Sequence, residues 1–344
     1  MNILLDVLGG DNSPDEFIKG AIESIEELEQ DTIITLIGKE DMITSKIKDF
    51  YNKELADFGG RIKVKNATEE ITNHDAPLEA IKTKTDSTMC VAFKMLKENE
   101  ADALVSAGNT GALMAGGLLK VGRIKGVDRP ALCPLLPTID GKGFLLLDAG
   151  ANTNCKPINL VQFAQMGSIY MKNAYGIDNP PVGLLNIGAE EEKGNQLTKD
   201  TYQLLKDQKD INFYGNIEAR YMFDGNVRVV VADGYTGNIA LKTTEGIGLT
   251  LGKMLKQELT GGLVSKIGAI FLKLSGAVGR LKKRMDYSEY GGALLLGIEK
   301  TIVKCHGTGK AKDVKIVLKQ AESTVKGKVT EAIKEAMTAK NVGA

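Results

Sequence analysis

The sequence predicts an α/β fold, and two observations lead to that class. Five apolar runs with the composition of buried strands are each followed by a loop rich in Gly, Asn and Asp. Helical patterns lie between these runs, and the alternation continues to about residue 248 with no Pro- or Ser-rich linker. We therefore expect residues 1–344 to form a single α/β domain, and the pattern is compatible with two lobes.

The first elements are predicted from short local signals. An apolar strand at 4–7 ends in a glycine turn. In segment 13–16, serine, proline and glutamate have the spacing of N-cap, N1 and N3, which predicts a capping box and a helix to about Leu28. The runs 32–37 and 61–64 predict two more strands.

The stretch 104–117 is the centre of the pattern. An apolar run breaks at Gly-Asn-Thr-Gly and resumes with small and apolar residues, as in a buried strand, a tight loop and a helix start. A helix from about Asp86 to Glu98 leads into this stretch, and the apolar run 132–136 behind it predicts a further strand.

Five loops follow the apolar runs, at 9–13, 108–111, 148–152, 188–195 and 232–238. Glycines let the backbone approach a ligand closely, and helix starts offer unpaired N–H groups at a positive dipole end. Parallel strands bring such loops to one edge of a sheet, where ligands of open α/β folds bind, so we expect all five to meet there. For one such loop alone, an ordinary turn is the better interpretation, and the prediction depends on the five occurring together.

Residues 249–285 interrupt the alternation and predict an amphipathic helical hairpin turning at 260–262. Between 253 and 284 there are eight Lys or Arg and one Glu, a charge of +7, which leaves 44 − 8 = 36 basic and 44 − 1 = 43 acidic residues elsewhere. This charge fits an anionic membrane surface or an acidic partner, and the alternative is a helix packed on the core with a solvated basic face. The apolar positions of the second helix are Leu263, Val264, Ile267, Ile270, Phe271, Leu274, Val278 and Leu281.

The chain from Ala311 onward is rich in Lys and Glu, with an apolar residue at every fourth position from Val325 to Met337. We expect a structural helix that packs on the outside of the domain.

Composition excludes several classes of function. The net charge is zero, which argues against a general nucleic-acid binder. Four cysteines without CxxC spacing and two histidines do not make a zinc site, so we expect no metal, no cofactor and reduced thiols. The N-terminus has no cationic region before its short apolar run, and we expect a cytoplasmic protein.

The loops indicate anion chemistry, since common nucleotide-binding, hydrolase and metalloprotease motifs are missing. Helix-start N–H groups, Asn109, Asn152, Asn238 and Lys193 suit a phosphate or an oxyanion. For each asparagine the alternative is a turn residue, and for Lys193 it is a solvated acidic loop. Cys155 also lies in a candidate loop, where a reactive thiol and a packed cysteine are both open readings.

The motifs resemble those of the bacterial phosphate acyltransferase family, the acyl-carrier-protein:phosphate transacylases of phospholipid synthesis. They span nearly the whole chain in the family's order. The matching segments are LGGDN (8–12), SAGNTGALMA (106–115), DRPAL (128–132), LLDAGANTNCKP (146–157), LLNIG (184–188), EEKGN (191–195), GNIEAR (215–220), DGYTGNIALKTTEG (233–246), EYGGALLLG (289–297) and HGTG (306–309).

The resemblance implies a three-layer α/β/α fold, isocitrate-dehydrogenase-like and related to phosphotransacetylase, with a projecting amphipathic hairpin. It implies a homodimer that converts acyl-acyl-carrier protein and inorganic phosphate to acyl phosphate. A membrane acyltransferase then uses that product to acylate glycerol 3-phosphate. The hairpin matches the element by which the family is thought to touch the membrane, so peripheral membrane association is expected.

Lys193 and Asn238 match residues implicated at the family's active site and are the expected catalytic residues. Phosphate is expected to attack the thioester directly, with Lys193 neutralising phosphate and Asn238 holding the oxyanion. The hairpin contacts are expected at Leu263, Ile267, Ile270, Phe271 and Leu274. The expected substrate- and phosphate-binding residues are Gly9, Gly10, Asp11, Asn12, Ser106, Gly108, Asn109, Thr110, Asn152, Asp233 and Gly237.

Two other functions fit the sequence. One is a phosphotransacetylase-like enzyme that uses short acyl-CoA, which would not need the hairpin. The other is a membrane-surface scaffold for lipid synthesis that has lost activity.

Overall fold

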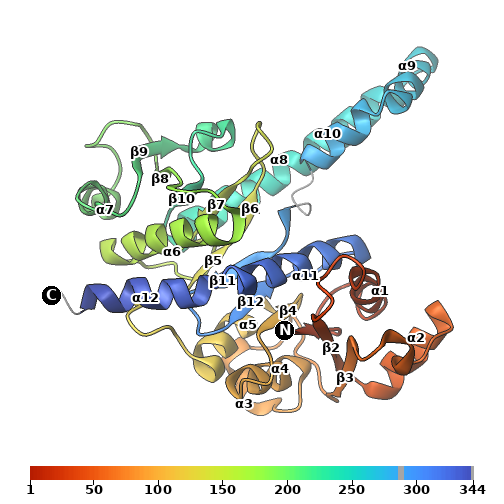
Figure 1. Cartoon of the computed structure of the whole chain (residues 1–344). Helices are drawn as coiled ribbons and strands as arrows, with labels where there is room; N and C mark the ends of the chain where they lie inside the picture. Colours follow the sequence, from red (N-terminus) through yellow and green to blue (C-terminus); the bar gives the residue numbers. More distant parts are fainter. Residues whose placement is uncertain (286–289, 342–344) are drawn as a thin grey trace.

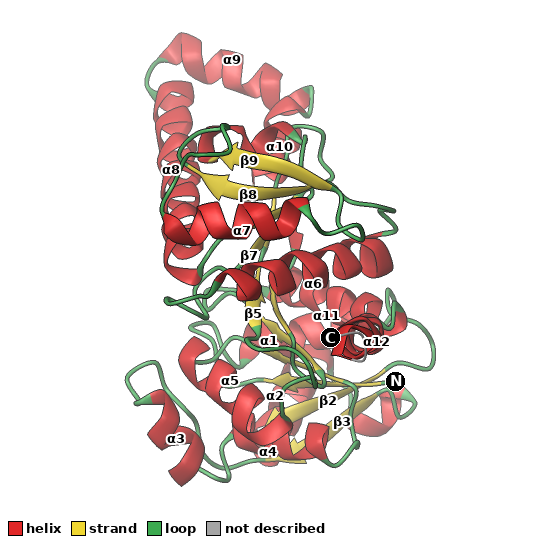
Figure 2. Cartoon of the chain, turned by 90° about the vertical axis from the view of Figure 1, so that its left-hand side faces the viewer, coloured by secondary structure: helices red, strands yellow, loops and turns green. Residues whose placement is uncertain are grey.

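Two β-sheets organise the chain, one in each of two lobes (Figures 1 and 2). The computed structural model describes residues 1–285 and 290–341. Within them the first lobe holds a seven-stranded sheet, parallel except at β11. Its spatial order is β3 (Ile62–Asn66), β2 (Ile33–Gly38), β1 (Asn2–Asp6), β4 (Ala103–Ser106), β12 (Thr301–Lys304), β11 (Ala293–Leu296) and β5 (Ala131–Cys133).

The second lobe holds a five-stranded sheet, parallel except at β6. The predicted strand 132–136 is in fact divided: Pro134 separates β5 from β6, and the two halves join different sheets. The spatial order is β6 (Leu135–Leu136), β7 (Phe144–Leu147), β10 (Val229–Val231), β8 (Val182–Asn186) and β9 (Phe213–Glu218).

The helices pack on both faces of the sheets, as the predicted three-layer α/β/α class requires. Those of the first lobe are α1 (Asp15–Ser24), α2 (Glu40–Tyr51), η1 (Leu55–Phe58), α3 (Pro77–Thr83), α4 (Thr88–Lys97), α5 (Thr110–Gly116) and η2 (Gly117–Val121). The remainder are α6 (Pro157–Tyr175), α7 (Gln196–Lys206), η3 (Ala219–Asp224), α8 (Gly234–Thr260), α9 (Leu263–Leu274), α10 (Ala277–Met285), α11 (Ala311–Lys326) and α12 (Val329–Asn341).

Alternate residues of each strand enter different core clusters. In β1, Ile3 and Leu5 pack with Phe17 of α1, whereas Leu4 packs on the opposite face with Phe93 of α4. Successive side chains of a strand point to opposite faces, so a strand covered on both sides is a continuous apolar run. This explains why the strands of the sequence pattern were uninterrupted rather than alternating.

Helices α11 and α12 lie between the two lobes (Figure 1). Val317 and Leu318 of α11 and Ile333 of α12 are buried in a core cluster that also includes α6 and both sheets. The prediction of one outer helix is therefore wrong in two respects. The helix is internal, and it breaks near Gly327, where an added Cβ would lie 2.5 Å from the Asn173 carbonyl oxygen.

The predicted capping box at the start of α1 is also wrong. The Ser13 hydroxyl accepts a hydrogen bond from Gly10 N at 2.8 Å, so it closes the preceding glycine turn. Helix α1 begins at Asp15 with no side-chain cap and ends at Ser24, before the expected Leu28. The predicted helix from about Asp86 to Glu98 is confirmed as α4, and Ser87 is its N-cap, because its hydroxyl accepts from Cys90 N.

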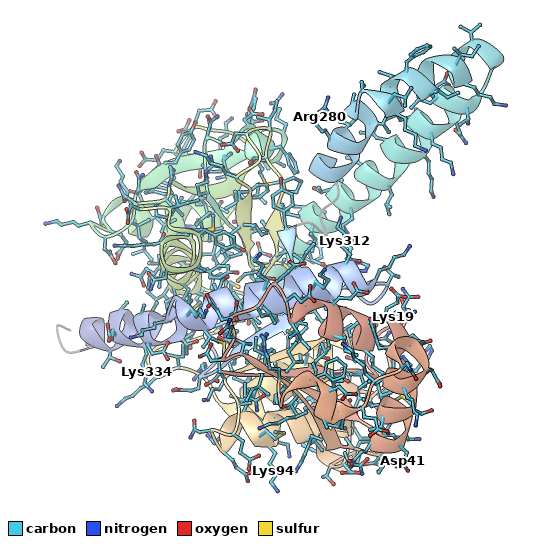
Figure 3. The ribbon with its side chains drawn as sticks, turned by 45° about the vertical axis from the view of Figure 1, so that its right-hand side comes forward. Lys19, Asp41, Lys94, Arg280, Lys312 and Lys334 are labelled. Atoms are coloured by element: carbon cyan, nitrogen blue, oxygen red, sulfur yellow. The ribbon has the colours of Figure 1, made fainter. Side chains whose placement is uncertain are left out.

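The predicted hairpin projects from the body of the molecule, and Arg280 marks its returning arm (Figure 3). Its first arm is the distal part of α8, which runs without a break from Gly234. Its second arm is two helices rather than one, because the chain turns at Gly276, where φ is +73°.

The hairpin's apolar face does not pack on the body. Ile270, Phe271 and Leu274 are 57%, 68% and 78% exposed, and Ile267 is 49% exposed. The alternative of a helix packed on the core is therefore wrong for these residues. The side chain of Leu263 and those of residues 282–285 lie outside the described part of the structure. No helix among the described residues is long and apolar enough to cross a membrane.

Candidate active site

Three loops meet at the carboxyl edge of the first sheet, following β1, β4 and β12. A Cβ added to Gly9 would lie 2.5 Å from Gly108 N, so these two backbones touch. Asp11 N donates to Gly307 O at 2.7 Å, and Asn12 Nδ2 donates to Thr308 O at 2.8 Å. The loop 305–309, which the sequence analysis did not assign to the site, thus joins the two predicted loops.

Most predicted phosphate ligands of this first edge are engaged within the protein. Ser106 Oγ donates to Asp6 Oδ2 at 2.7 Å and accepts from Gly108 N at 3.1 Å. Asn109 caps α5 by accepting from Ala112 N at 3.0 Å, and its amide donates to Thr72 O at 3.2 Å. These contacts give the residues a role in holding loops together, and phosphate binding by them stays a prediction. Thr110, the exposed first residue of α5, and Gly10 complete the predicted set on this edge.

Asp6 and Lys304 are residues of opposite charge at this edge that the sequence analysis missed. Asp6 is buried, and burial raises the pKa of its carboxyl group, which hydrogen bonds and the Lys304 charge partly offset. Lys304 Nζ donates to Ala107 O at 2.8 Å and to Cys305 O at 2.7 Å, and burial lowers its pKa. In both cases the sequence could have indicated the residue, because a charged side chain ends an otherwise apolar strand.

Asp148 organises the corresponding edge of the second lobe. Its buried carboxylate accepts from Leu132 N and Ala151 N at 3.0 Å and from Asn152 N at 2.6 Å. Burial raises its pKa, and these hydrogen bonds counteract the rise. The Asn152 amide donates to Pro130 O at 2.7 Å and to Asp148 Oδ2 at 2.9 Å, so its N–H groups are used inside the loop.

The first N–H groups of α8 are paired within the protein. Asp233 is the N-cap, and its Oδ1 accepts from Tyr235 N and Thr236 N at 3.0 Å. Gly234 N donates to Asn152 O at 2.7 Å, and Gly237 N to Asp233 O at 2.9 Å. The sequence-based expectation that this helix start supplies N–H donors to an oxyanion is therefore wrong.

Gly237 is required for close packing of α8 on the loop 148–152. A Cβ at this position would lie 1.9 Å from the Asp148 carbonyl oxygen. We expect Gly237→Ala to lower the free energy of unfolding by about 2 kcal/mol, as overpacking does. Urea unfolding measures this change.

Gly246 provides the matched control in the same helix, because no atom lies within 4 Å of its added Cβ. Gly246→Ala should stabilise the helix by about 0.5–1 kcal/mol. Equal stability of the two alanine variants would contradict a packing role for Gly237.

Asn238 differs from the other predicted asparagines. Its side chain is exposed in the first turns of α8, and within the described residues it has no hydrogen-bond partner. It faces the loop 148–152, because a Cβ added to Gly150 would lie 3.5 Å from Asn238 Oδ1. Its amide is thus available to a ligand at this edge.

Lys193 lies in the loop between β8 and α7, and its ammonium is exposed. Glu191 of the same loop pairs instead with Lys206 at 3.1 Å and Gln203 at 2.7 Å, and among the described residues Lys193 has no ion pair. The backbone N–H groups of residues 188–192 also have no partner in the described structure. Successive free N–H groups in a loop beside a cation are typical of an anion site.

The five predicted loops are divided between the two lobes. The expectation that all five meet at one sheet edge is wrong, since two follow the first sheet and three the second. Strands β10 and β8 are parallel neighbours, with Val231 opposite Leu184, so the start of α8, which carries Asn238, and the loop that carries Lys193 follow adjacent strands. The structure therefore places the two expected catalytic residues after neighbouring strands of the second lobe.

Cys155 is poorly suited to act as a nucleophile. Burial raises its pKa to about 11, so the thiol is protonated at neutral pH. In residues 1–285 and 290–341, no group of three or more His, Cys, Asp or Glu side chains is placed to hold a metal ion.

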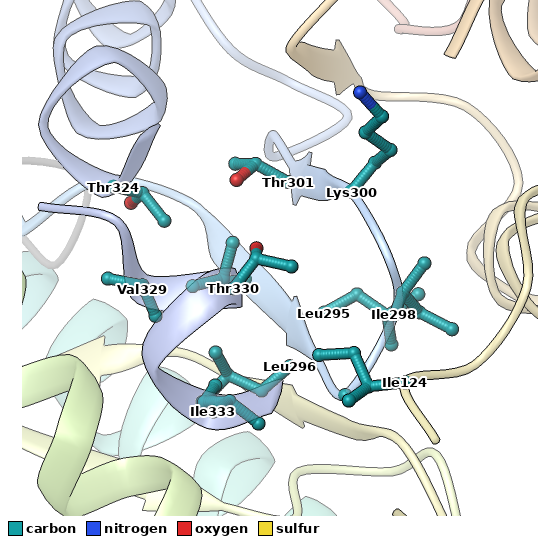
Figure 4. Close-up of a pocket in the computed structure, with 12 residues that line it drawn as sticks. Ile124, Leu295, Leu296, Ile298, Lys300, Thr301, Thr324, Val329, Thr330 and Ile333 are labelled. Atoms are coloured by element: carbon teal, nitrogen blue, oxygen red, sulfur yellow. The ribbon is translucent and has the colours of Figure 1, made fainter. Parts of the chain in front are cut away.

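A small pocket lies apart from these loops, between the β11–β12 turn and α12 (Figure 4). Ile298, Val329 and Ile333 line it, with Lys300 and Thr301 at its border. None of the predicted site residues contributes to it, so it is not part of the candidate active site.

Two solved structures with this fold are, by their titles, a phosphotransacetylase and a branched-chain phosphotransacylase. A phosphotransacetylase from Streptococcus pyogenes superposes with a TM-score of 0.59 at 12% identity, covering 94% of this chain and 93% of its own. A branched-chain phosphotransacylase from Enterococcus faecalis gives 0.56 at 16% identity, covering 94% and 99%. The chain thus has the α/β fold of the phosphotransacetylases, which confirms the predicted fold class.

Sequence comparison defines the family. The family model described as "Fatty acid synthesis protein" matches residues 1–332. The chain is 48% identical over 335 residues to the phosphate acyltransferase of Thermoanaerobacter pseudethanolicus, covering 97% of each. It is 46% identical over 335 residues to that of Bacillus subtilis, again covering 97% of each. The chain belongs to the phosphate acyltransferase family and is an acyltransferase.

Proposed function

We propose that this acyltransferase moves a fatty acyl group from acyl-acyl-carrier protein to inorganic phosphate and so supplies acyl phosphate for phospholipid synthesis. The observation that carries the proposal is the pair Lys193 and Asn238. They follow neighbouring strands, are exposed, and have no side-chain partner among the described residues. The family relationship supplies the reaction class, and the proposal extends it to the donor and the pathway.

The reaction needs no nucleophilic side chain. A phosphate oxygen attacks the thioester carbonyl carbon, a C–O bond forms, and the carbonyl oxygen becomes negative. The intermediate then collapses, the C–S bond breaks, and the carrier thiolate leaves and takes a proton from water. Lys193 and the free N–H groups of 188–192 hold the phosphate, and the Asn238 amide donates to the oxyanion. The protonated Cys155 supports direct attack over an acyl-enzyme.

The test is phosphate-dependent release of free carrier protein from purified acyl-acyl-carrier protein. We expect release with phosphate and none without it. Release only from acyl-CoA would favour the phosphotransacetylase-like alternative. No turnover of either donor, in a protein that still binds vesicles, would favour the scaffold.

The hairpin is proposed to place the enzyme at an anionic membrane surface, where a membrane acyltransferase takes up the product and acylates glycerol 3-phosphate. The exposed Ile267, Ile270, Phe271 and Leu274 lie on a helix that also carries Lys266 and Lys273. Burial of apolar side chains stabilises membrane binding, and each basic residue near such a surface contributes roughly 1 kcal/mol in addition. We also propose a homodimer, as in the family, which a mass measurement in solution tests.

Phe271→Asp is expected to reduce binding to anionic vesicles strongly, and wild-type binding should weaken as salt rises. Co-sedimentation measures both effects, and a melting curve on the same variant should show no loss of stability, because Phe271 is exposed. Leu78→Asp replaces an exposed apolar side chain on α3, 58% exposed against 68% for Phe271, and serves as the control. If the wild-type protein does not bind anionic vesicles, the membrane proposal is refuted.

A further inference from the structure

Two asparagine side chains hold the turn 190–193, which carries Lys193. Asn216 Nδ2 donates to Glu190 O at 2.7 Å, and Asn186 Nδ2 donates to Lys193 O at 3.1 Å. The turn itself is closed by Lys193 N, which donates to Glu190 O at 3.2 Å. The first and the last carbonyl group of the turn are therefore both bonded to side chains from outside it.

Both asparagines belong to strands, so their own positions are fixed by the sheet. Asn186 is the last residue of β8, and Asn216 lies in β9, opposite Leu184 of β8. The Asn186 amide is oriented by a second bond, because its Oδ1 accepts from Ile187 N at 2.9 Å. A loop that is bonded to regular structure in this way is placed more precisely than a loop held only at its ends.

The Asn216 side chain is 4% exposed, and its burial is not explained by core stability. Its Oδ1 is buried and has no hydrogen-bond partner in the part of the chain that the structure describes. A buried acceptor without a partner lowers stability, and an apolar side chain would avoid that cost. The bond from Nδ2 to Glu190 O is thus the contact that an asparagine supplies here and an apolar residue would not.

Fixing the carbonyl groups of the turn also fixes the direction in which the Lys193 side chain leaves it. The stem of that side chain passes close to the start of the loop, since a Cβ added to Gly188 would lie 3.0 Å from Lys193 Cγ. A cation that is held in place before its ligand binds stabilises charge without a cost of reorganisation. The two asparagines therefore act on the charge that the proposed reaction uses.

We propose that Asn186 and Asn216 are positioning residues that hold the turn 190–193 so that the Lys193 ammonium reaches the attacking phosphate. The inference rests on the proposed function, in which Lys193 binds that phosphate. Each asparagine acts through the backbone of the turn. Loss of either amide therefore weakens the use of phosphate and leaves binding of the acyl donor unchanged.

The experiment measures steady-state kinetics of the full-length protein with acyl-acyl-carrier protein and varied phosphate. Asn216→Asp keeps the size of the side chain and replaces the N–H donor with an oxygen, which repels Glu190 O. We expect the KM for phosphate to rise about tenfold and the KM for the acyl donor to stay unchanged. Asn186→Ala, at a partly buried position, should give the same pattern, and it tests the inference if Asn216→Asp does not fold.

Asn212→Asp is the matched control. Asn212 directly precedes β9, and its Nδ2 donates to a loop carbonyl outside the turn 190–193, Asn179 O, at 3.0 Å. The substitution removes the same kind of bond from the same part of the sheet. It should change neither KM.

Combination with Lys193→Ala separates positioning from a general loss of structure. If Asn216 acts through Lys193, Asn216→Asp lowers kcat/KM for phosphate much less in the Lys193→Ala protein than in wild type. A tenfold loss in both proteins would overturn the inference. An unchanged KM for phosphate, or an equal rise in the KM values of both substrates, would overturn it as well.

Failure of the proposed function would be recognised separately, as a wild-type protein that releases no carrier protein when phosphate is added. The inference is then decided by the dissociation constant for inorganic phosphate, measured by titration with phosphorus NMR. This constant should rise about tenfold in Asn216→Asp and in Asn186→Ala, and stay at the wild-type value in Asn212→Asp. Equal constants in Asn216→Asp and wild type would overturn the inference.

Discussion

Replacing Lys193 with alanine is expected to lower kcat/KM for phosphate-dependent thioester cleavage by about 10²–10³, the usual effect of losing one charge-stabilising group. The ammonium is exposed and has no ion pair in the described structure, so the substitution breaks no salt bridge. The melting temperature should therefore stay at the wild-type value. Steady-state kinetics with varied phosphate, and a thermal melt, measure the two quantities.

Lys199 supplies the control for this substitution, since it is an exposed lysine in α7, directly after the same loop. Lys199→Ala should keep wild-type activity, which separates a local role from a general effect of surface charge. A Lys193→Ala enzyme with near wild-type kcat/KM would show that the phosphate is held elsewhere.

Asn238→Ala should lower kcat by about 10² and change the KM for phosphate much less, because an oxyanion donor acts mainly in the transition state. Its stability should be unchanged, since the amide has no partner among the described residues. A pure KM effect would reassign Asn238 to ground-state phosphate binding. An unaltered enzyme would leave it an ordinary exposed helix residue.

Asn152→Ala is the informative comparison. The Asn152 amide bonds to Pro130 O and Asp148 Oδ2, so its loss removes contacts within the loop. We expect this variant to melt at a lower temperature, and Asn238→Ala to melt like the wild type. The opposite pattern would exchange the roles assigned to the two asparagines.

Local patterns predicted the strands and most helices because burial on both faces leaves continuous apolar runs. They did not predict which strands share a sheet. The run 132–136 is uninterrupted in apolar character apart from Pro134, yet its halves pair with β11 and β7 in different lobes. Apolar spacing also continued through the break at Gly276, because periodicity records burial and not backbone turns.

The candidate site was predictable as a set of loops but not as a set of available donors. Ser106 bonds to Asp6, one hundred residues away, and Asp11 bonds to Gly307 at the other end of the chain. The residues that surround each position in the sequence do not indicate hydrogen-bond partners so far away along the chain. Lys193 and Asn238 are exposed, the first in a loop and the second in the first turns of α8, and their catalytic role stays a prediction. Asn109 and Asp233 are helix caps in the structure, as turn chemistry also allowed.

The strand order of the first sheet has a consequence for synthesis of the protein. Strand β4 pairs with β12, so one side of β4 has no neighbour until residues 301–304 have left the ribosome. The second sheet is complete once β10 has emerged at Val231. An N-terminal fragment therefore exposes an unpaired central strand, the kind of edge that promotes association between chains. During translation the lobe that begins second becomes complete first.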